Sequence, residues 1–167
     1  MLPYGETLAG FSAWYRQSWA ESLGKNGGGT TPIQAVGTTD QHSQLQLYLD
    51  GPPDKFFTII TAKRLGTGLP IKAPNIPELE YLQGKTVGDV MEAEQRATIE
   101  TLVAHGCPVR TITLDAINEH SLGALLAHFT LEIYFMAHLL DVNAFDQPAV
   151  EEGKVRARDY LLKGLGS

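Results

Sequence analysis

The sequence predicts an α/β domain of three layers, in which helices flank a mainly parallel sheet. Helical and strand-like segments alternate along most of the 167 residues, which is typical of parallel sheets covered by helices. The chain is 43% hydrophobic and 19% charged, as expected of a folded globular protein. Only three strand-like runs occur, and sheet edges need covering. We therefore expect an incomplete sheet, with further sheet-forming sequence upstream in a longer protein.

The first predicted element is an amphipathic helix over residues 5–23. Its apolar side chains recur every three or four residues and share one face: Leu8, Phe11, Trp14, Tyr15, Trp19 and Leu23. Gly24 is a suitable helix stop, and the glycines at 27–29 allow tight or left-handed turns. A short apolar run at residues 33–37 follows Pro32, and we interpret it as a buried strand.

A second helix is predicted to begin near Thr38. Thr38, Thr39 and Asp40 can each cap its first turn, and it ends at Asp50, before Gly-Pro-Pro. The capping residues place His42 in the first turn, where a helix dipole favours a neutral imidazole.

A strand and a surface excursion come next. Residues 56–62, FFTIITA, form a dense β-branched and aromatic run that predicts a buried strand. Residues 64–85 are rich in glycine and proline and are interpreted as a surface excursion, with a short helical turn near residues 78–82.

The last part of the chain alternates again. A helix is predicted from Thr86 to Gly106, a strand over residues 108–115 and a buried helix over 122–140. A loop at residues 143–148 then leads to a final helix at about 149–162.

The apolar segment at residues 122–140 approaches the length of a membrane span. It contains His128, Glu132 and His138, whose polar side chains are costly in lipid. We interpret it as a core helix and expect no association with membranes.

Charge and cysteine content indicate which binding partners and which cellular compartment to expect. The net charge is −6 and the basic residues are scattered, so we expect no nucleic-acid partner. The start, MLPYGETLAG, lacks the basic and apolar regions of a signal peptide. The single cysteine, Cys107, cannot form an internal disulfide, and a reducing, cytoplasmic location is expected.

Three motifs resemble the glucose-6-phosphate isomerase family. They are AESLGK at residues 20–25, GTTDQHSQLQL at 37–47 and FDQPAVEEGK at 145–154. The resemblance implies the later part of an enzyme with two sugar-isomerase (SIS) domains. Residues 1–140 would form a partial SIS-type α/β domain, and residues 141–167 a C-terminal loop and helix with the signature lysine.

The family resemblance implies an aldose–ketose isomerisation of glucose 6-phosphate and fructose 6-phosphate through an enediol. That reaction needs a group that opens the sugar ring, a base that moves a proton between C1 and C2, and stabilisation of the enediol oxygens. It requires no cofactor and no metal. The five histidines form no recognisable metal-ligand pattern, and we expect no metal site.

Glu21 and His42 are the catalytic residues implied by the first two motifs. A carboxylate has two oxygens and reaches adjacent carbons with little movement, which suits Glu21 to the proton shuttle. The imidazole of His42 can give and take protons, which suits ring opening. The family builds its active site across a dimer interface, so we expect a homodimer in which His42 acts on the partner's substrate.

Lys154, at the end of the third motif, is the remaining catalytic candidate. Its ammonium could assist ring opening and steady negative charge. Gln17 lies one helical turn before Glu21, and the resemblance implies that it contacts the substrate; Gln147 is a second candidate for such a contact. Together Glu21, His42 and Lys154 are expected to converge on one sugar phosphate.

A second function class stays open from the sequence. The family binds the phosphate group through Ser/Thr-rich loops of the earlier SIS domain and through an arginine before the matched region. Neither has a counterpart in this chain, so the alternative is a catalytically inactive sugar-phosphate-binding or dimerisation module.

Overall fold

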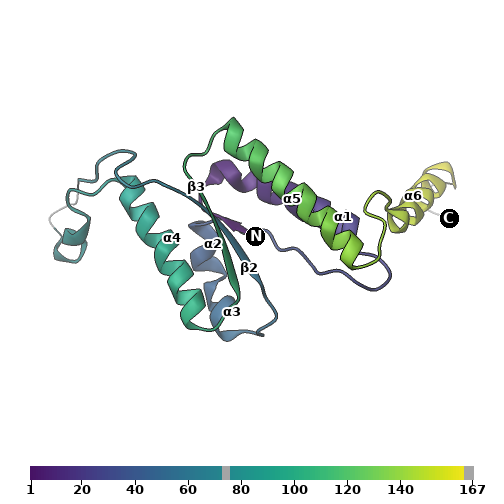
Figure 1. Ribbon diagram of the computed structural model, residues 1–167, viewed down its shortest axis with the longest axis horizontal. Coiled ribbons are helices and arrows are strands. Elements are labelled where there is room, and N and C mark those ends of the chain that lie inside the picture. Colours follow the sequence, from purple (N-terminus) through teal and green to yellow (C-terminus); the bar gives the residue numbers. More distant parts are fainter. Residues whose placement is uncertain (73–75, 164–167) are drawn as a thin grey trace. The chain divides into compact units, whose positions relative to one another are not determined.

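The computed structural model describes residues 1–72 and 76–163, and residues 73–75 of the predicted excursion lie outside it. The elements along the chain are β1 (Leu2–Pro3), η1 (Glu6–Leu8), α1 (Ala9–Leu23), α2 (Thr39–Ser43), α3 (Leu45–Asp50), β2 (Phe57–Ala62), η2 (Pro77–Leu82), α4 (Val87–Ala104), β3 (Val109–Leu114), α5 (Glu119–Leu139), η3 (Pro148–Val150) and α6 (Glu151–Lys163). Figure 1 labels the main helices and strands.

The chain divides into two compact units. The first contains residues 1–16 and 33–126, and the second contains residues 17–32 and the chain from 127 onward. Helices α1 and α5 each contribute their first turns to the first unit and their later turns to the second. The domain boundary expected at residue 140 stays a prediction.

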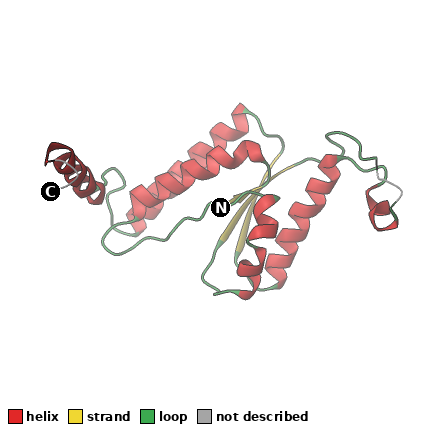
Figure 2. Ribbon diagram, turned by 180° about the vertical axis from the view of Figure 1, so that it is seen from behind, coloured by secondary structure: helices red, strands yellow, loops and turns green. Residues whose placement is uncertain are grey.

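The first unit is built on a three-stranded parallel sheet in the order β1-β2-β3 (Figure 2). In the register, Leu2 lies opposite Ile59, and Phe57 lies opposite Val109. Every residue of the central strand β2 is buried, so helices cover both of its faces. The predicted α/β class with a parallel, incomplete sheet is confirmed.

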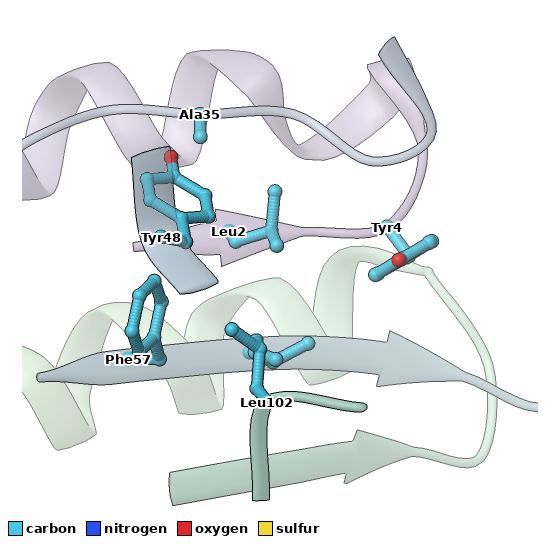
Figure 3. Close-up of a cluster of buried hydrophobic side chains, with 7 residues drawn as sticks. Leu2, Tyr4, Ala35, Tyr48, Phe57 and Leu102 are labelled. Carbon is cyan, nitrogen blue, oxygen red and sulfur yellow. The ribbon is translucent and has the colours of Figure 1, made fainter. Parts of the chain in front are cut away.

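The core on one face of the sheet joins β1 and β2 to helices α3 and α4 (Figure 3). Its buried side chains are Leu2, Tyr4, Ala35, Tyr48, Phe57, Ile59 and Leu102. Tyr48 meets the Phe57 ring edge-on, with centroids 4.9 Å apart and an interplanar angle of 68°. This contact fixes α3, and the turn before it, against the start of β2.

The identity of the first strand differs from the prediction. The regular strand is Leu2–Pro3, whereas residues 33–37 run beside it with only one isolated bridge, from Tyr4 to Gly37. Backbone bonds join the two segments: Ala35 N–H donates to the Met1 carbonyl at 3.0 Å and Gly37 N–H to the Pro3 carbonyl at 2.9 Å. A two-residue strand offers too few partners for a regular ladder, and Ile33 remains 52% exposed.

The second predicted helix is broken. Gln44 has φ −121° and ψ −11°, outside helical geometry, so α2 ends at Ser43 and α3 begins at Leu45. The five-residue α2 places His42 in its last turn. A helix of five residues has a small dipole, so the expected effect of a helix dipole on His42 stays a prediction.

The later elements follow the prediction closely. Thr86 caps α4 with a full capping box: its hydroxyl accepts from Asp89 N–H, and the Asp89 carboxylate accepts from Thr86 N–H. The short helical turn expected near residues 78–82 is η2, and the third strand is β3.

Helix α5 is not the buried helix that the sequence predicted. Side chains four residues apart pack inward, namely Leu125, Phe129, Ile133 and Ala137. Its other face exposes Leu131 (55%), Tyr134 (50%), Phe135 (59%) and Leu139 (75%). The prediction took apolar composition for burial, whereas only one stripe of the helix is buried among residues 1–72 and 76–163.

By length and composition alone, α5 is long and apolar enough to cross a membrane, and it is the one such helix in the described part of the chain. Its polar pair, His128 and Glu132, lies one turn apart with Nε2 and Oε2 3.6 Å from each other. Core helices of soluble proteins share this length and composition, so the expectation of no membrane association stays a prediction.

Candidate functional site

Glu21 and Gln17 lie on adjacent turns of α1 and contact each other. Gln17 Nε2 donates a hydrogen bond to Glu21 Oε1 at 3.0 Å. Their four-residue spacing predicted that they share one face of the helix, and the structure shows that the two side chains are in direct contact. Both side chains are exposed in this chain, and one carboxylate oxygen of Glu21 is held by the amide.

The end of α1 is fixed by a small core in the second unit. Leu23 is fully buried with Ile133 and Ala137 of α5, and Trp19 packs at the margin. The Trp19 indole N–H also donates to Thr30 Oγ1 at 3.0 Å, which ties the glycine-rich loop back to the helix. Glu21 therefore projects from a helix end that is anchored on both sides.

Lys25 joins the first motif to the third. Its ammonium lies 2.9 Å from Asp146 Oδ1 and also donates to the Asn143 carbonyl, and its side chain is only 11% exposed. AESLGK and FDQPAVEEGK, far apart in the sequence, thus meet in the second unit. Sequence reasoning missed this pair, although opposite charges within two family motifs were a usable signal.

Asp146 is the centre of the loop after α5. Its Oδ2 accepts from Asn143 Nδ2 at 3.0 Å, while Phe145 N–H donates to Asn143 Oδ1 at 3.0 Å. The hydrogen bond from Lys25 holds the pKa of Asp146 below its ordinary value of 3.8, against a smaller opposing effect of desolvation. The loop that leads to Gln147 is therefore held by an ionised carboxylate.

The pH dependence of this contact is testable. Because the folded-state pKa of Asp146 is lowered, the contact stabilises the loop above the unfolded pKa and is lost as the pH falls through the folded value. In a carboxyl-detected NMR titration, we expect Asp146 to titrate below 3.8, and its midpoint to rise in Lys25→Met. An unchanged midpoint in that variant would show that Lys25 does not hold the carboxylate.

Lys154 and Gln147 lie on the C-terminal part of the second unit. Gln147 precedes η3, and Lys154 is in α6, where its ammonium lies 2.6 Å from Glu151 Oε1. Both partners of this ion pair are 63% exposed, and such pairs contribute about 0–1 kcal/mol. The pair is therefore a weak contact that holds Lys154 only loosely.

His42 is exposed on α2 in the first unit. The turn before it is organised by Asp40, whose Oδ2 accepts from Val36 N–H at 2.7 Å and whose Oδ1 accepts from the Ser43 hydroxyl at 2.9 Å. His42 belongs to the first unit, whereas Glu21 and Lys154 belong to the second. The convergence of these three residues on one substrate stays a prediction.

Potential metal ligands do not cluster in the described ranges, residues 1–72 and 76–163. No group of three or more His, Cys, Asp and Glu side chains in these ranges could hold a metal ion. The pairs that the structure brings together are a hydrogen bond between Gln17 and Glu21 and an ion pair between Lys25 and Asp146.

Comparison with known proteins identifies the family. The phosphoglucose isomerase family model matches residues 1–164. A probable glucose-6-phosphate isomerase from Halobacterium salinarum is 44% identical over 165 residues, which are 98% of this chain and 38% of that protein. The chain thus spans about two fifths of the length of the curated relatives that it matches.

Two solved structures are similar to this chain in fold. A hypothetical protein from Thermus thermophilus superposes with a TM-score of 0.90 at 37% identity, over 96% of this chain and 40% of that one. A glucose-6-phosphate isomerase from Chlamydia trachomatis has a TM-score of 0.72 at 22% identity, over 96% and 34%, and so shares the fold. The match over residues 1–164 and the curated relatives together show that the chain belongs to the phosphoglucose isomerase family.

Proposed function

We propose that this chain is the C-terminal part of an enzyme that interconverts glucose 6-phosphate and fructose 6-phosphate. The family match over residues 1–164 carries the proposal. The contact between Gln17 and Glu21 supports it, because a carboxylate held by a neighbouring amide is a suitably oriented base.

In the proposed reaction, Glu21 takes the proton from C2 of the open-chain aldose and returns it to C1. The electron pair of the broken C2–H bond forms the C1=C2 double bond, and the C1 carbonyl oxygen takes up a proton to complete the enediol. The C2 hydroxyl then gives up its proton as C2=O forms, and the double-bond electrons take the proton from Glu21 at C1, so no proton is gained or lost overall. Because one carboxylate oxygen accepts from Gln17, the other is available to the substrate carbon. The general base and its orienting amide thus come from one helix, α1.

Ring opening is assigned to His42, which moves a proton between the ring oxygen and the anomeric hydroxyl. Lys154 would exchange Glu151 for the sugar and steady negative charge during this step. Gln147 follows the Asp146 loop and is proposed to contact the substrate. The proposed reaction uses a sugar phosphate alone, with no cofactor.

We further propose that the complete enzyme is a cytoplasmic homodimer in which His42 acts on the partner's substrate. The exposure of both Glu21 and His42 supports this, because proton-transfer groups work best where water is excluded. In the complete enzyme, the remaining sequence and the partner subunit would supply that exclusion.

The alternative function, a catalytically inactive sugar-phosphate-binding or dimerisation module (here called the silent module), applies to the isolated chain. Phosphate-binding residues position the sugar, and their loss removes the binding energy that aligns the reacting carbons. A coupled assay of fructose 6-phosphate conversion should show turnover by the complete enzyme, and at least a roughly hundredfold lower rate for residues 1–167 alone. Equal turnover by the isolated chain would defeat the silent-module alternative, and no turnover by the complete enzyme would defeat the proposed function.

A further inference from the structure

A network of hydrogen bonds holds the turn that carries His42. The proposed reaction assigns no role to the residues of this network. Asp40 is at its centre, with hydrogen bonds from Val36 N–H and the Ser43 hydroxyl to its two oxygens. The Gln44 side chain also donates to this carboxylate, and this bond is the largest cause of the lowered pKa of Asp40. The turn is therefore closed around a carboxylate that stays ionised near neutral pH.

A buried tyrosine supports this network from α3. Tyr48 is 8% exposed, and its hydroxyl donates to Gln44 Oε1 at 2.9 Å. With its oxygen occupied by Tyr48, the Gln44 amide offers its N–H groups to Asp40. Burial, followed by the charge of Asp40, raises the pKa of Tyr48 to about 12, so the phenol remains a donor throughout the ordinary pH range.

A second buried tyrosine holds the middle of α2. Tyr4 is 0% exposed and directly follows β1, and its hydroxyl donates to Gln41 Oε1 at 2.6 Å. Thr98 hydrogen-bonds to the same phenol from α4. Burial raises the pKa of Tyr4 to about 12, so this phenol also remains protonated.

The backbone approaches Tyr4 closely at the start of the turn. A Cβ built on Gly37 would lie 2.7 Å from two atoms of the Tyr4 ring, a distance that real side chains do not reach. The ring thus packs directly on the glycine while its hydroxyl holds Gln41. Tyr4 therefore fixes both the entry to the turn and the helix that follows it.

We propose that Tyr4 and Tyr48 are positioning residues for His42, acting through Gln41 and Gln44; this rests on the proposed role of His42 in ring opening. Gln41 lies within α2 and Gln44 directly follows its last residue, whereas His42 is turned about 100° from Gln41 around the helix. Two buried phenols therefore hold the short helix at its middle and just after its last residue, and His42 lies between the two held residues. A five-residue helix has little stability of its own, so these outside contacts determine its orientation.

Hydrogen exchange on the chain tests whether the tyrosines hold the turn. The reporters are the backbone N–H groups of Val36, Asp40 and Gln44, which bond within the turn. Tyr4→Phe and Tyr48→Phe each delete one hydroxyl and keep the ring, and each should speed exchange at these positions about two- to tenfold. Exchange that is unchanged in both variants would overturn the proposal.

Thr61→Val is the matched control. It removes a buried hydroxyl that bonds Thr113 Oγ1 at 3.0 Å between β2 and β3, away from the turn. This variant should melt at a temperature similar to that of the tyrosine variants, yet leave exchange at Asp40 and Gln44 unchanged. Equal acceleration in Thr61→Val would show a general loss of stability and would overturn the proposal.

Kinetics of the complete enzyme separate positioning from stability. Each tyrosine variant should lower kcat for the cyclic substrate by about two- to tenfold, with KM nearly constant, and should spare an analogue that stays open. A looser turn with normal turnover of both substrates would overturn the positioning role and leave the proposed function standing. Lack of isomerase activity in the unmodified enzyme would remove the proposed function, while hydrogen exchange would still decide whether the tyrosines hold the turn.

Discussion

Replacing Glu21 by glutamine in the complete enzyme is expected to slow exchange of the C2 proton with solvent by roughly 10²- to 10⁴-fold, the usual contribution of a general base. The amide that replaces the carboxylate cannot take up a proton at neutral pH. It can still accept the hydrogen bond that Gln17 donates at 3.0 Å, so α1 should keep its structure. The measurement is deuterium incorporation at C2 of glucose 6-phosphate in heavy water, followed by proton NMR.

Glu100→Gln is the control for this substitution. Glu100 is an exposed glutamate on α4 that pairs with Arg96 at 2.8 Å, and the same change of charge there should leave exchange unaffected. The melting temperatures of both variants should match that of the unmodified enzyme, because exposed single pairs contribute little. Normal exchange in Glu21→Gln would remove Glu21 from the proton shuttle.

Removing the His42 imidazole should separate cyclic from open substrates. In His42→Ala, we expect turnover of cyclic fructose 6-phosphate to fall by roughly 10²- to 10⁴-fold, because ring opening loses its acid and base. An analogue that lacks the 5-hydroxyl group stays open, and its conversion should change little. The two rates are measured in parallel under single-turnover conditions.

His120→Ala provides the comparison, since His120 is an exposed histidine in the first turn of α5 and belongs to the same unit. It should leave both rates unchanged. Equal losses on both substrates in His42→Ala would argue against ring opening and would favour a role of His42 in binding or in the fold.

Elements with strong local signals were predictable from the sequence. The β-branched run of β2 and the start of α4 at Thr86 each depend on a few neighbouring residues, and both elements were predicted correctly. The strand Leu2–Pro3 was missed because two residues show no period. The break at Gln44 was missed because it depends on side-chain bonds to Asp40 and Tyr48.

Some contacts of the candidate site were likewise predictable from the sequence, and others were not. The contact between Gln17 and Glu21 follows from helical spacing alone. The pairing of Lys25 with Asp146 depends on how the ends of α1 and α5 pack, which local patterns do not encode. The exposed face of α5 was mistaken for core because composition reports how apolar a helix is, and not which of its sides has a neighbour.

The close approach of Gly37 to the Tyr4 ring has a consequence for mutational tolerance. Position 37 accepts hydrogen alone as its side chain, because even a methyl group would overlap the aromatic carbons at 2.7 Å. Gly10, by contrast, has open space where a methyl group would go. Substitutions at positions 4 and 37 are therefore coupled. A larger residue at position 37 would require a smaller residue without a ring at position 4, and the hydrogen bond from the Tyr4 hydroxyl to Gln41 would then be lost.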